Sequence, residues 1–271
     1  MRLSEQGTWT YGHPSTQLFR SLATAIDIGL EILETPAGRR ALCGLGHALV
    51  LYRKYDRHHR RPRFTGNVIN MEQYVDHFLA RVRYDFPVVT VEHLGEHVLA
   101  STGLGHPTTH LRDFQPKRAG IFSYSLPSMI ERSQDLKRKA STWRDGHYFL
   151  FSHACSTVHE LAHLFTSYFS LGVDFPDTPR ALTYRNYGQH GGGEAGRWLE
   201  YVFFGGSVEF YKRRSDGPEQ AGVPYLIDPD GLYHRVHPDT VIEAVTYPRA
   251  YQFPFGVVGP GVTGAQLSNK L

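Results

Sequence analysis

The stretch STVHELAHLF (residues 156–165) contains the pattern His-Glu-x-x-His, formed by His159, Glu160 and His163. On a helix, the two histidines lie one turn apart and project from the same face, so both imidazoles can reach one metal ion. The neighbouring residues are apolar, and histidines and a glutamate in an apolar helix would be costly to bury without partners. The motif therefore predicts a site for one Zn²⁺ per chain, on a buried helix over residues 148–169.

Glu160 has a different predicted role from the two histidines. It lies about 100° around the helix from His159, so its carboxylate can address a water on the metal without ligating the metal. The metal would acidify that water and Glu160 would take its proton, which is the chemistry of metal-assisted hydrolysis. The alternative interpretation is a core helix whose histidines are satisfied by other hydrogen bonds. Sixteen histidines in 271 residues are more than a core needs, and they favour the metal site.

The motif resembles the active-site helix of the zincin metallopeptidases. The metzincin branch would require a glycine and then a histidine soon after the motif, but the next histidine after His163 is His190. In the gluzincin branch the third ligand is a glutamate at the start of a second helix, and Gly193-Glu194-Ala195-Gly196 (193–196) is similar to that stretch. The resemblance therefore implies a zinc-dependent hydrolase in which His159, His163 and Glu194 hold the metal.

The third metal ligand has several alternatives in the sequence. A glutamate in the first turn of a helix is favoured by the helix dipole alone, so Glu194 could be purely structural. Glu200 could ligate the metal, or it could accept the N–H of a ligating histidine. Cys155 lies on the same helical stripe as the two histidines, but we expect it to be a small buried core residue. The remaining candidates for the third ligand are His190, Asp174, Asp177 and Glu209.

A zincin also needs a donor that stabilises the oxyanion of the tetrahedral intermediate. Tyr187 and His190 are the nearest candidates, in the long polar loop over residues 170–191. The alternative is that the aromatic residues of this loop pack as a lid. The strand GIFSYS (120–125) precedes the motif helix, and the resemblance implies that an edge strand there binds an extended peptide. Further candidate donors are Tyr211, His234 and His237.

Three functions are compatible with these residues. The first is a metallopeptidase-like zinc hydrolase that cleaves a peptide or amide bond. The second keeps the zincin fold and the metal, but acts on a non-peptide small molecule in a biosynthetic pathway. The third is a structural zinc protein or a catalytically inactive binding protein, and the presence of Glu160 argues against it because a structural site needs no base.

The composition is that of a globular protein, with 41% apolar and 20% charged residues. The net charge of +3 is too mild to indicate nucleic-acid binding. No apolar stretch is long enough to span a membrane, the N-terminus has no apolar signal region, and Cys43 and Cys155 make no disulfide scaffold. We therefore expect a cytoplasmic protein that binds a peptide or small-molecule substrate, and neither nucleic acid nor a membrane. The oligomeric state stays open.

The hydrophobic periodicity predicts an α+β fold with extra N-terminal helices, and the resemblance implies that this fold is zincin-like, with a small mixed sheet. We expect a single domain over residues 1–271, or two lobes over about 1–145 and 146–271. Asp230-Gly231 indicates a hairpin turn. The Gly- and Pro-rich tail after 251 is expected to be ordered only by docking. Helices are predicted at 15–34, 39–54, 70–84, 127–140, 148–169 and 193–212, and strands at 88–93, 97–101 and 120–125.

Overall fold

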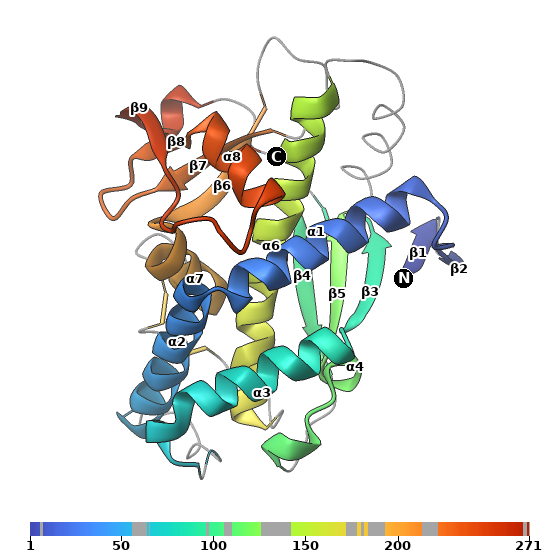
Figure 1. The fold of residues 1–271 in the computed structure, drawn as a ribbon, viewed down its shortest axis with the longest axis vertical. Helices are drawn as coiled ribbons and strands as arrows, with labels where there is room; N and C mark the ends of the chain where they lie inside the picture. Colours follow the sequence, from blue (N-terminus) through green and yellow to red (C-terminus); the bar gives the residue numbers. More distant parts are fainter. Residues whose placement is uncertain are drawn as a thin grey trace.

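The computed structural model shows an α+β protein with two separate sheets (Figure 1). The predicted helix at 127–140 lies outside the described residues, as does most of the predicted loop at 170–191. No helix among the described residues is long and apolar enough to cross a membrane. The described residues are 1–5, 8–55, 64, 66–95, 98–105, 110–125, 142–171, 178–179, 182–183, 193–212, 222–267 and 270.

The first sheet has the strand order β2-β1-β3-β5-β4. Strands β1, β3 and β5 run parallel, while β4 runs antiparallel to β5 and forms one edge. On the inner face of this sheet, Val91, Phe122 and Tyr124 are buried and belong to the apolar core. The strands are β1 (Arg2–Glu5), β2 (Thr8–Tyr11), β3 (Val88–Glu92), β4 (Ala100–Leu104) and β5 (Gly120–Ser125).

The position of β5 corrects one prediction. The strand GIFSYS is present, but it lies inside the sheet and not at its edge. The chain between β3 and β5 returns as β4, which pairs along the outer side of β5 and takes the edge position. The predicted strand at 97–101 is this edge strand, displaced toward the C-terminus so that it begins at Ala100.

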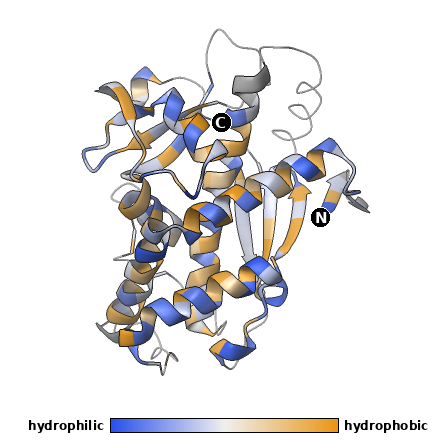
Figure 2. Cartoon of the chain, in the orientation of Figure 1, coloured by the Kyte–Doolittle hydropathy of each residue, from blue (hydrophilic) through white to orange (hydrophobic). Residues whose placement is uncertain are grey.

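The N-terminal half supplies three helices, α1 (Gln17–Glu34), α2 (Pro36–Tyr55) and α3 (Met71–Tyr84), which confirm the helices predicted there. The N-cap of α1 is Thr16, whose side chain accepts the N–H of Phe19 at 3.3 Å. Figure 2 shows hydrophilic and hydrophobic stripes on these helices, as expected of helices that bury one face. Shorter helical turns are η1 (Val68–Asn70), η2 (Leu111–Asp113), α4 (Pro116–Ala119) and η3 (Gly264–Gln266).

Helix α6 (Thr142–Ser170) runs through the middle of the protein, with β3–β5 on one side and the second sheet on the other (Figure 1). It packs against α1, α7, α8 and the edge strand β4. Its buried aromatic residues include Phe151, Phe165 and Tyr168, which belong to one continuous apolar core. The predicted buried helix at 148–169 is therefore confirmed, and it places the His-Glu-x-x-His motif at the centre of the structure.

The second sheet follows α7 and has the order β6-β7-β8-β9. The predicted hairpin at Asp230-Gly231 is confirmed, because β7 and β8 pair antiparallel on either side of it. The tail after 251 contributes the edge strand β9 to this sheet. The elements are α7 (Ala195–Phe204), β6 (Ser207–Tyr211), β7 (Val223–Ile227), β8 (Tyr233–Val236), α8 (Pro238–Thr246) and β9 (Val257–Val262).

The prediction of one helix over 193–212 is wrong in its second half. Helix α7 ends at Gly205, which has a φ of 90° and therefore adopts the left-handed conformation that glycine favours at helix ends. The chain then enters β6, an edge strand of the second sheet. This ending brings β6 back toward the first turn of α7, where the candidate site lies.

Candidate metal centre

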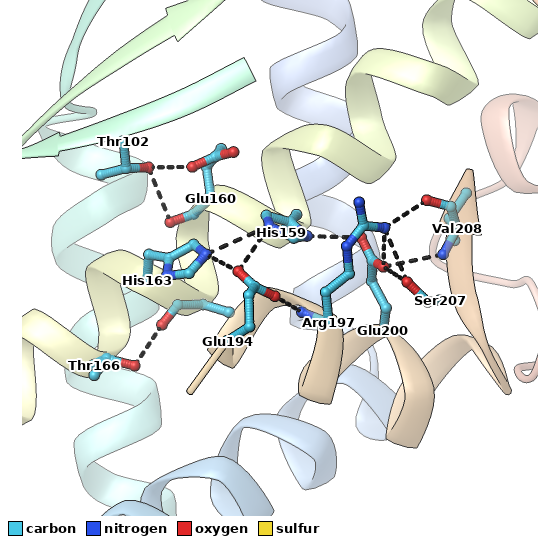
Figure 3. Close-up of polar contacts among 11 residues, drawn as sticks. Thr102, His159, Glu160, His163, Thr166, Glu194, Arg197, Glu200, Ser207 and Val208 are labelled. Atoms are coloured by element: carbon cyan, nitrogen blue, oxygen red, sulfur yellow. Dashed lines mark hydrogen bonds and ion pairs between the residues drawn. The ribbon is translucent and has the colours of Figure 1, made fainter. Parts of the chain in front are cut away.

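Three potential metal ligands meet where α6 faces the start of α7 (Figure 3). The Nε2 atoms of His159 and His163 are 3.4 Å apart. The Glu194 Oε1 atom is 3.2 Å from the His159 Nε2 atom and 2.5 Å from the His163 Nε2 atom. Ligand atoms around a tetrahedral zinc ion lie about 3.3 Å from one another, as the usual Zn–N and Zn–O distances require. Two of the three separations match this value and the His163–Glu194 separation is shorter, so the three residues could hold a metal ion.

Glu194 also caps helix α7. Its Oε2 atom accepts the backbone N–H of Arg197 at 2.5 Å, so Glu194 is the N-cap residue. Its other oxygen, Oε1, faces the histidines of α6. The structural role and the ligand role considered for Glu194 are therefore compatible, because each uses a different oxygen.

The backbone around Glu194 is held close to an earlier part of the chain. The Glu194 N–H donates to the Leu182 carbonyl at 2.7 Å, and the Gly193 N–H donates to the Thr178 carbonyl at 2.6 Å. A Cβ atom on Gly193 would lie only 2.1 Å from the Pro179 carbonyl oxygen. Glycine at 193 therefore permits a close approach that fixes the start of α7.

Gly196 permits a second close approach, which the sequence analysis missed. A Cβ atom there would lie 2.5 Å from the Nε2 and Cε1 atoms of His159. The first turn of α7 thus packs directly against the His159 ring. A glycine in the first turn of a helix, two residues after a candidate ligand, is the signal that could have indicated this contact.

Glu200 supports His159 from the opposite side of the ring. The His159 Nδ1 atom donates to the Glu200 Oε1 atom at 2.8 Å, because a carboxylate can only accept. This bond orients the ring so that its Nε2 atom faces Glu194 and His163. The second Glu200 oxygen, Oε2, accepts from Ser207 Oγ at 3.1 Å and from the Val208 N–H at 3.0 Å.

Arg197 completes the surroundings of Glu200. Its Nη1 atom donates to the Glu200 Oε2 atom at 3.1 Å and to the Val208 carbonyl at 2.7 Å. Burial alone would raise the pKa of Glu200, but Arg197, His159 and the Val208 N–H lower it below its usual value. Glu200 is therefore a buried carboxylate with its oxygens satisfied, in the supporting role that the sequence analysis gave as the alternative to ligation.

The electrostatics of the centre favour positive charge. Burial alone would lower the pKa of His159, but the carboxylates of Glu194 and Glu200 raise it well above its usual value. Burial likewise opposes ionisation of Glu194, yet the two histidines lower its pKa. The two carboxylates therefore stabilise a cation at this position, which a proton or a metal ion can supply.

Glu160 lies beside the three candidate ligands without joining them. Its side chain is buried, and its Oε2 atom accepts the Thr102 hydroxyl at 2.6 Å (Figure 3). Thr102 belongs to the edge strand β4. The sequence could not indicate this contact, since it depends on which strand takes the edge of the sheet.

A pocket of about 210 Å³ adjoins the centre. Its walls come from α6, α7, β6 and the residues that lead into β4, and they include His159 and Glu160. Cys155, which is buried as predicted, also lines this pocket and is not one of the three grouped ligands. The pocket thus offers space beside both the candidate ligand His159 and the candidate base Glu160.

The other predicted site residues divide into two groups. Tyr187, His190, Asp174 and Asp177 lie outside the described residues. Glu209, Tyr211, His234 and His237 are described, and none belongs to the group of three candidate ligands, although Glu209 lines the adjoining pocket. Their hydrogen bonds are Tyr211 Oη to Glu209 Oε2 at 2.7 Å, His234 Nε2 to Asp228 Oδ2 at 2.8 Å and the Asp239 N–H to His237 Nδ1 at 3.2 Å.

Three candidate ligands thus converge from α6 and the start of α7, and their supporting residues are Glu200 of α7 and Thr102 of β4. Comparison with protein-family models, curated proteins and solved structures finds no match for this chain.

Proposed function

We propose that this protein is a zinc-dependent hydrolase of a peptide or amide bond. His159, His163 and Glu194 would hold the metal, and Glu160 would be the general base. The observation that carries the proposal is the convergence of three ligand atoms from α6 and α7 beside a buried glutamate. The proposal is also supported by a motif helix beside a small mixed sheet and by a glutamate at the start of a second helix, two features that the zincin resemblance implies.

The proposed chemistry assigns a separate role to each side chain. A bound Zn²⁺ would supply a Lewis acid and lower the pKa of water at an open coordination position. Glu160 would accept the proton of the attacking water and deliver it to the leaving nitrogen. The Thr102 hydroxyl donates to Glu160 Oε2, so Oε1 is the oxygen left to take the proton. Glu200 keeps His159 Nδ1 protonated and its Nε2 available as a ligand.

A group of three candidate ligands beside a buried glutamate is the arrangement that a catalytic zinc site requires. Structural zinc sites are closed by four protein ligands, whereas catalytic sites use three and leave one position open. In the described part of the chain, the group consists of three residues. A buried glutamate adjacent to this group has no use in a structural site but is required for hydrolysis.

The proposal is tested with a panel of peptides and of amide and ester metabolites. Zinc-loaded protein should hydrolyse at least one peptide, and removal of the metal with a chelator should abolish the activity until zinc is restored. Hydrolysis of ester or amide metabolites alone would favour the small-molecule alternative. Zinc-loaded protein that hydrolyses no member of the panel would contradict the proposal.

The third ligand is distinguished from its neighbour by two alanine variants. Glu194→Ala should lose zinc under mild chelation, because Glu194 Oε1 faces both histidines. Glu200→Ala should retain more zinc, with affinity or activity lowered by about 10–100-fold. Glu200 bonds to the Nδ1 atom of His159, on the side of the ring opposite to the candidate ligand atom Nε2. The measurement is zinc content after dialysis against a weak chelator. The reverse order would move the ligand to Glu200.

Thr102 is expected to position Glu160. Thr102→Val keeps the shape of the side chain but removes the hydroxyl that donates to Glu160. Loss of a hydrogen bond to a charged group typically costs about 1.5–3 kcal/mol, so we expect kcat to fall by about 10–100-fold. KM and zinc content should change little, and Thr102→Ser should restore most of kcat. Equal activities of the valine and serine variants would show that the hydroxyl has no role.

A further inference from the structure

The pocket beside the metal centre contains an ion pair that the proposed chemistry does not use. The pocket is lined by His159 and Glu160, and also by Glu209 and Lys270. The Lys270 Nζ atom lies 2.5 Å from the Glu209 Oε1 atom. Glu209 comes from the edge strand β6, whereas Lys270 comes from the tail that follows β9. A charged pair is thus placed in the same pocket as the candidate base.

Glu209 requires a cation at this position. Its side chain is only 3% exposed, and its Oε2 atom accepts the hydroxyl of Tyr211 at 2.7 Å. Burial and the neighbouring Glu209 carboxylate raise the pKa of Tyr211, so this tyrosine remains a donor and supplies no charge. Burying a carboxylate is costly unless an opposite charge compensates it. In the structure that compensation comes from Lys270.

Lys270 is held less firmly than Glu209. Its side chain is 35% exposed, and its backbone pairs with Tyr211 through an isolated β-bridge at the free edge of β6. Lysine carries a compact charge on a long flexible stem, so its ammonium group can move away from Glu209 when another cation takes its place. An outside ammonium group could therefore replace Lys270 at Glu209 with little loss to the fold.

We propose that this pocket binds a primary ammonium group of the substrate, carried on an aliphatic stem like that of lysine. Glu209 recognises its charge, and Lys270 is the internal group that the substrate displaces. The inference rests on the proposed function, since it places the recognised group beside Glu160 and the candidate metal ligands. The ammonium group belongs either to a lysine residue of a peptide or to a small alkylamine.

The test measures binding and needs no turnover. Nα-acetyl-lysine amide is titrated into the purified protein and into Lys270→Ala, with Nα-acetyl-norleucine amide as the uncharged control. We expect Lys270→Ala to bind the lysine amide at least about tenfold more tightly than the unaltered protein does, because the competing ammonium is gone. The lysine amide should also raise the Tm of this variant, whereas the norleucine amide should not.

The charge recognition is assigned to Glu209 by a second substitution. Adding Glu209→Gln to Lys270→Ala should abolish the preference for the lysine amide over the norleucine amide. If the double variant does not fold, the affinities of Lys270→Ala for the two amides decide whether the pocket recognises the ammonium group. Two results would overturn the inference. One is that Lys270→Ala binds the lysine amide no more tightly than the unaltered protein does. The other is that Lys270→Ala binds the lysine amide no more tightly than it binds the norleucine amide.

Two further arms separate the remaining possibilities. If n-butylamine and the lysine amide bind Lys270→Ala equally tightly, a small amine is supported as the source of the ammonium group. If n-butylamine binds more weakly than the lysine amide, a peptide is supported. Because binding is measured without turnover, a protein with lysine selectivity and no zinc or hydrolysis contradicts the proposed function alone. A working hydrolase without lysine selectivity overturns this inference alone.

Discussion

Glu160→Gln is expected to lower turnover by at least about 100-fold while leaving the zinc content unchanged. The amide keeps the size of the side chain but cannot accept a proton, and a general base typically contributes about 10²–10⁴-fold to the rate. Glu160 is not one of the three grouped ligands, and its Oε2 atom is bound to Thr102. The measurements are kcat on the substrate found in the panel and zinc per chain in the same preparation.

The glutamine variant carries its own structural control. Its side-chain oxygen can still accept the Thr102 hydroxyl, so the contact between α6 and β4 is retained. An unchanged Tm would show that the packing is intact. Turnover equal to that of the unaltered protein would mean that another group takes the proton. Loss of zinc from Glu160→Gln would instead make Glu160 a ligand.

Replacement of both His159 and His163 by alanine is expected to remove the metal completely. The unaltered protein should carry close to one zinc per chain, because the two Nε2 atoms are separated by 3.4 Å, close to the spacing of neighbouring ligands on one zinc ion. One carboxylate oxygen of Glu194 would be left as the remaining ligand of the group. Zinc content by mass spectrometry, after purification without added metal, measures the outcome.

A histidine elsewhere in the fold supplies the matched control. His234→Ala removes an imidazole that pairs with Asp228 on the hairpin of the second sheet, so it should leave the zinc content unchanged. Full zinc retention by the double-histidine variant would exclude the site. If the variant lost its fold together with its zinc, the metal would have a structural role.

The local signals of the sequence were sufficient for four long helices, but they missed α8 and extended α7 over β6. The apolar spacing predicted α1, α2, α3 and the buried α6, because each helix buries one face and its period is visible in a short window. The motif on α6 and Glu194 before α7 could be identified for the same reason, since each depends on residues close in sequence. Glu200 was identified as an alternative, and its role required the structure.

Long-range pairing was where the sequence was insufficient. Strand β4 forms the edge of the first sheet because it pairs antiparallel with β5, and a short sequence window does not show this pairing. The same pairing explains why GIFSYS is not the edge strand. It also explains why Thr102 of β4 can contact Glu160. The β1–β2 hairpin and β9 were not predicted. The two adjacent glycines Gly205 and Gly206 are the signal that could have indicated the end of α7. The helix was extended past them because the apolar residues that follow also suit a helix.

The placement of the candidate ligands on two helices has a consequence for the unfolded chain. An ion held by His163 and Glu194 would join α6 to α7 and close a loop of about 30 residues. Such a cross-link restricts the unfolded chain, much as a disulfide does, and for a loop of this length the chain-entropy relation gives about 3.5 kcal/mol. Part of the stabilisation from the metal would therefore arise from the conformations denied to the unfolded protein, and not from contacts within the folded one.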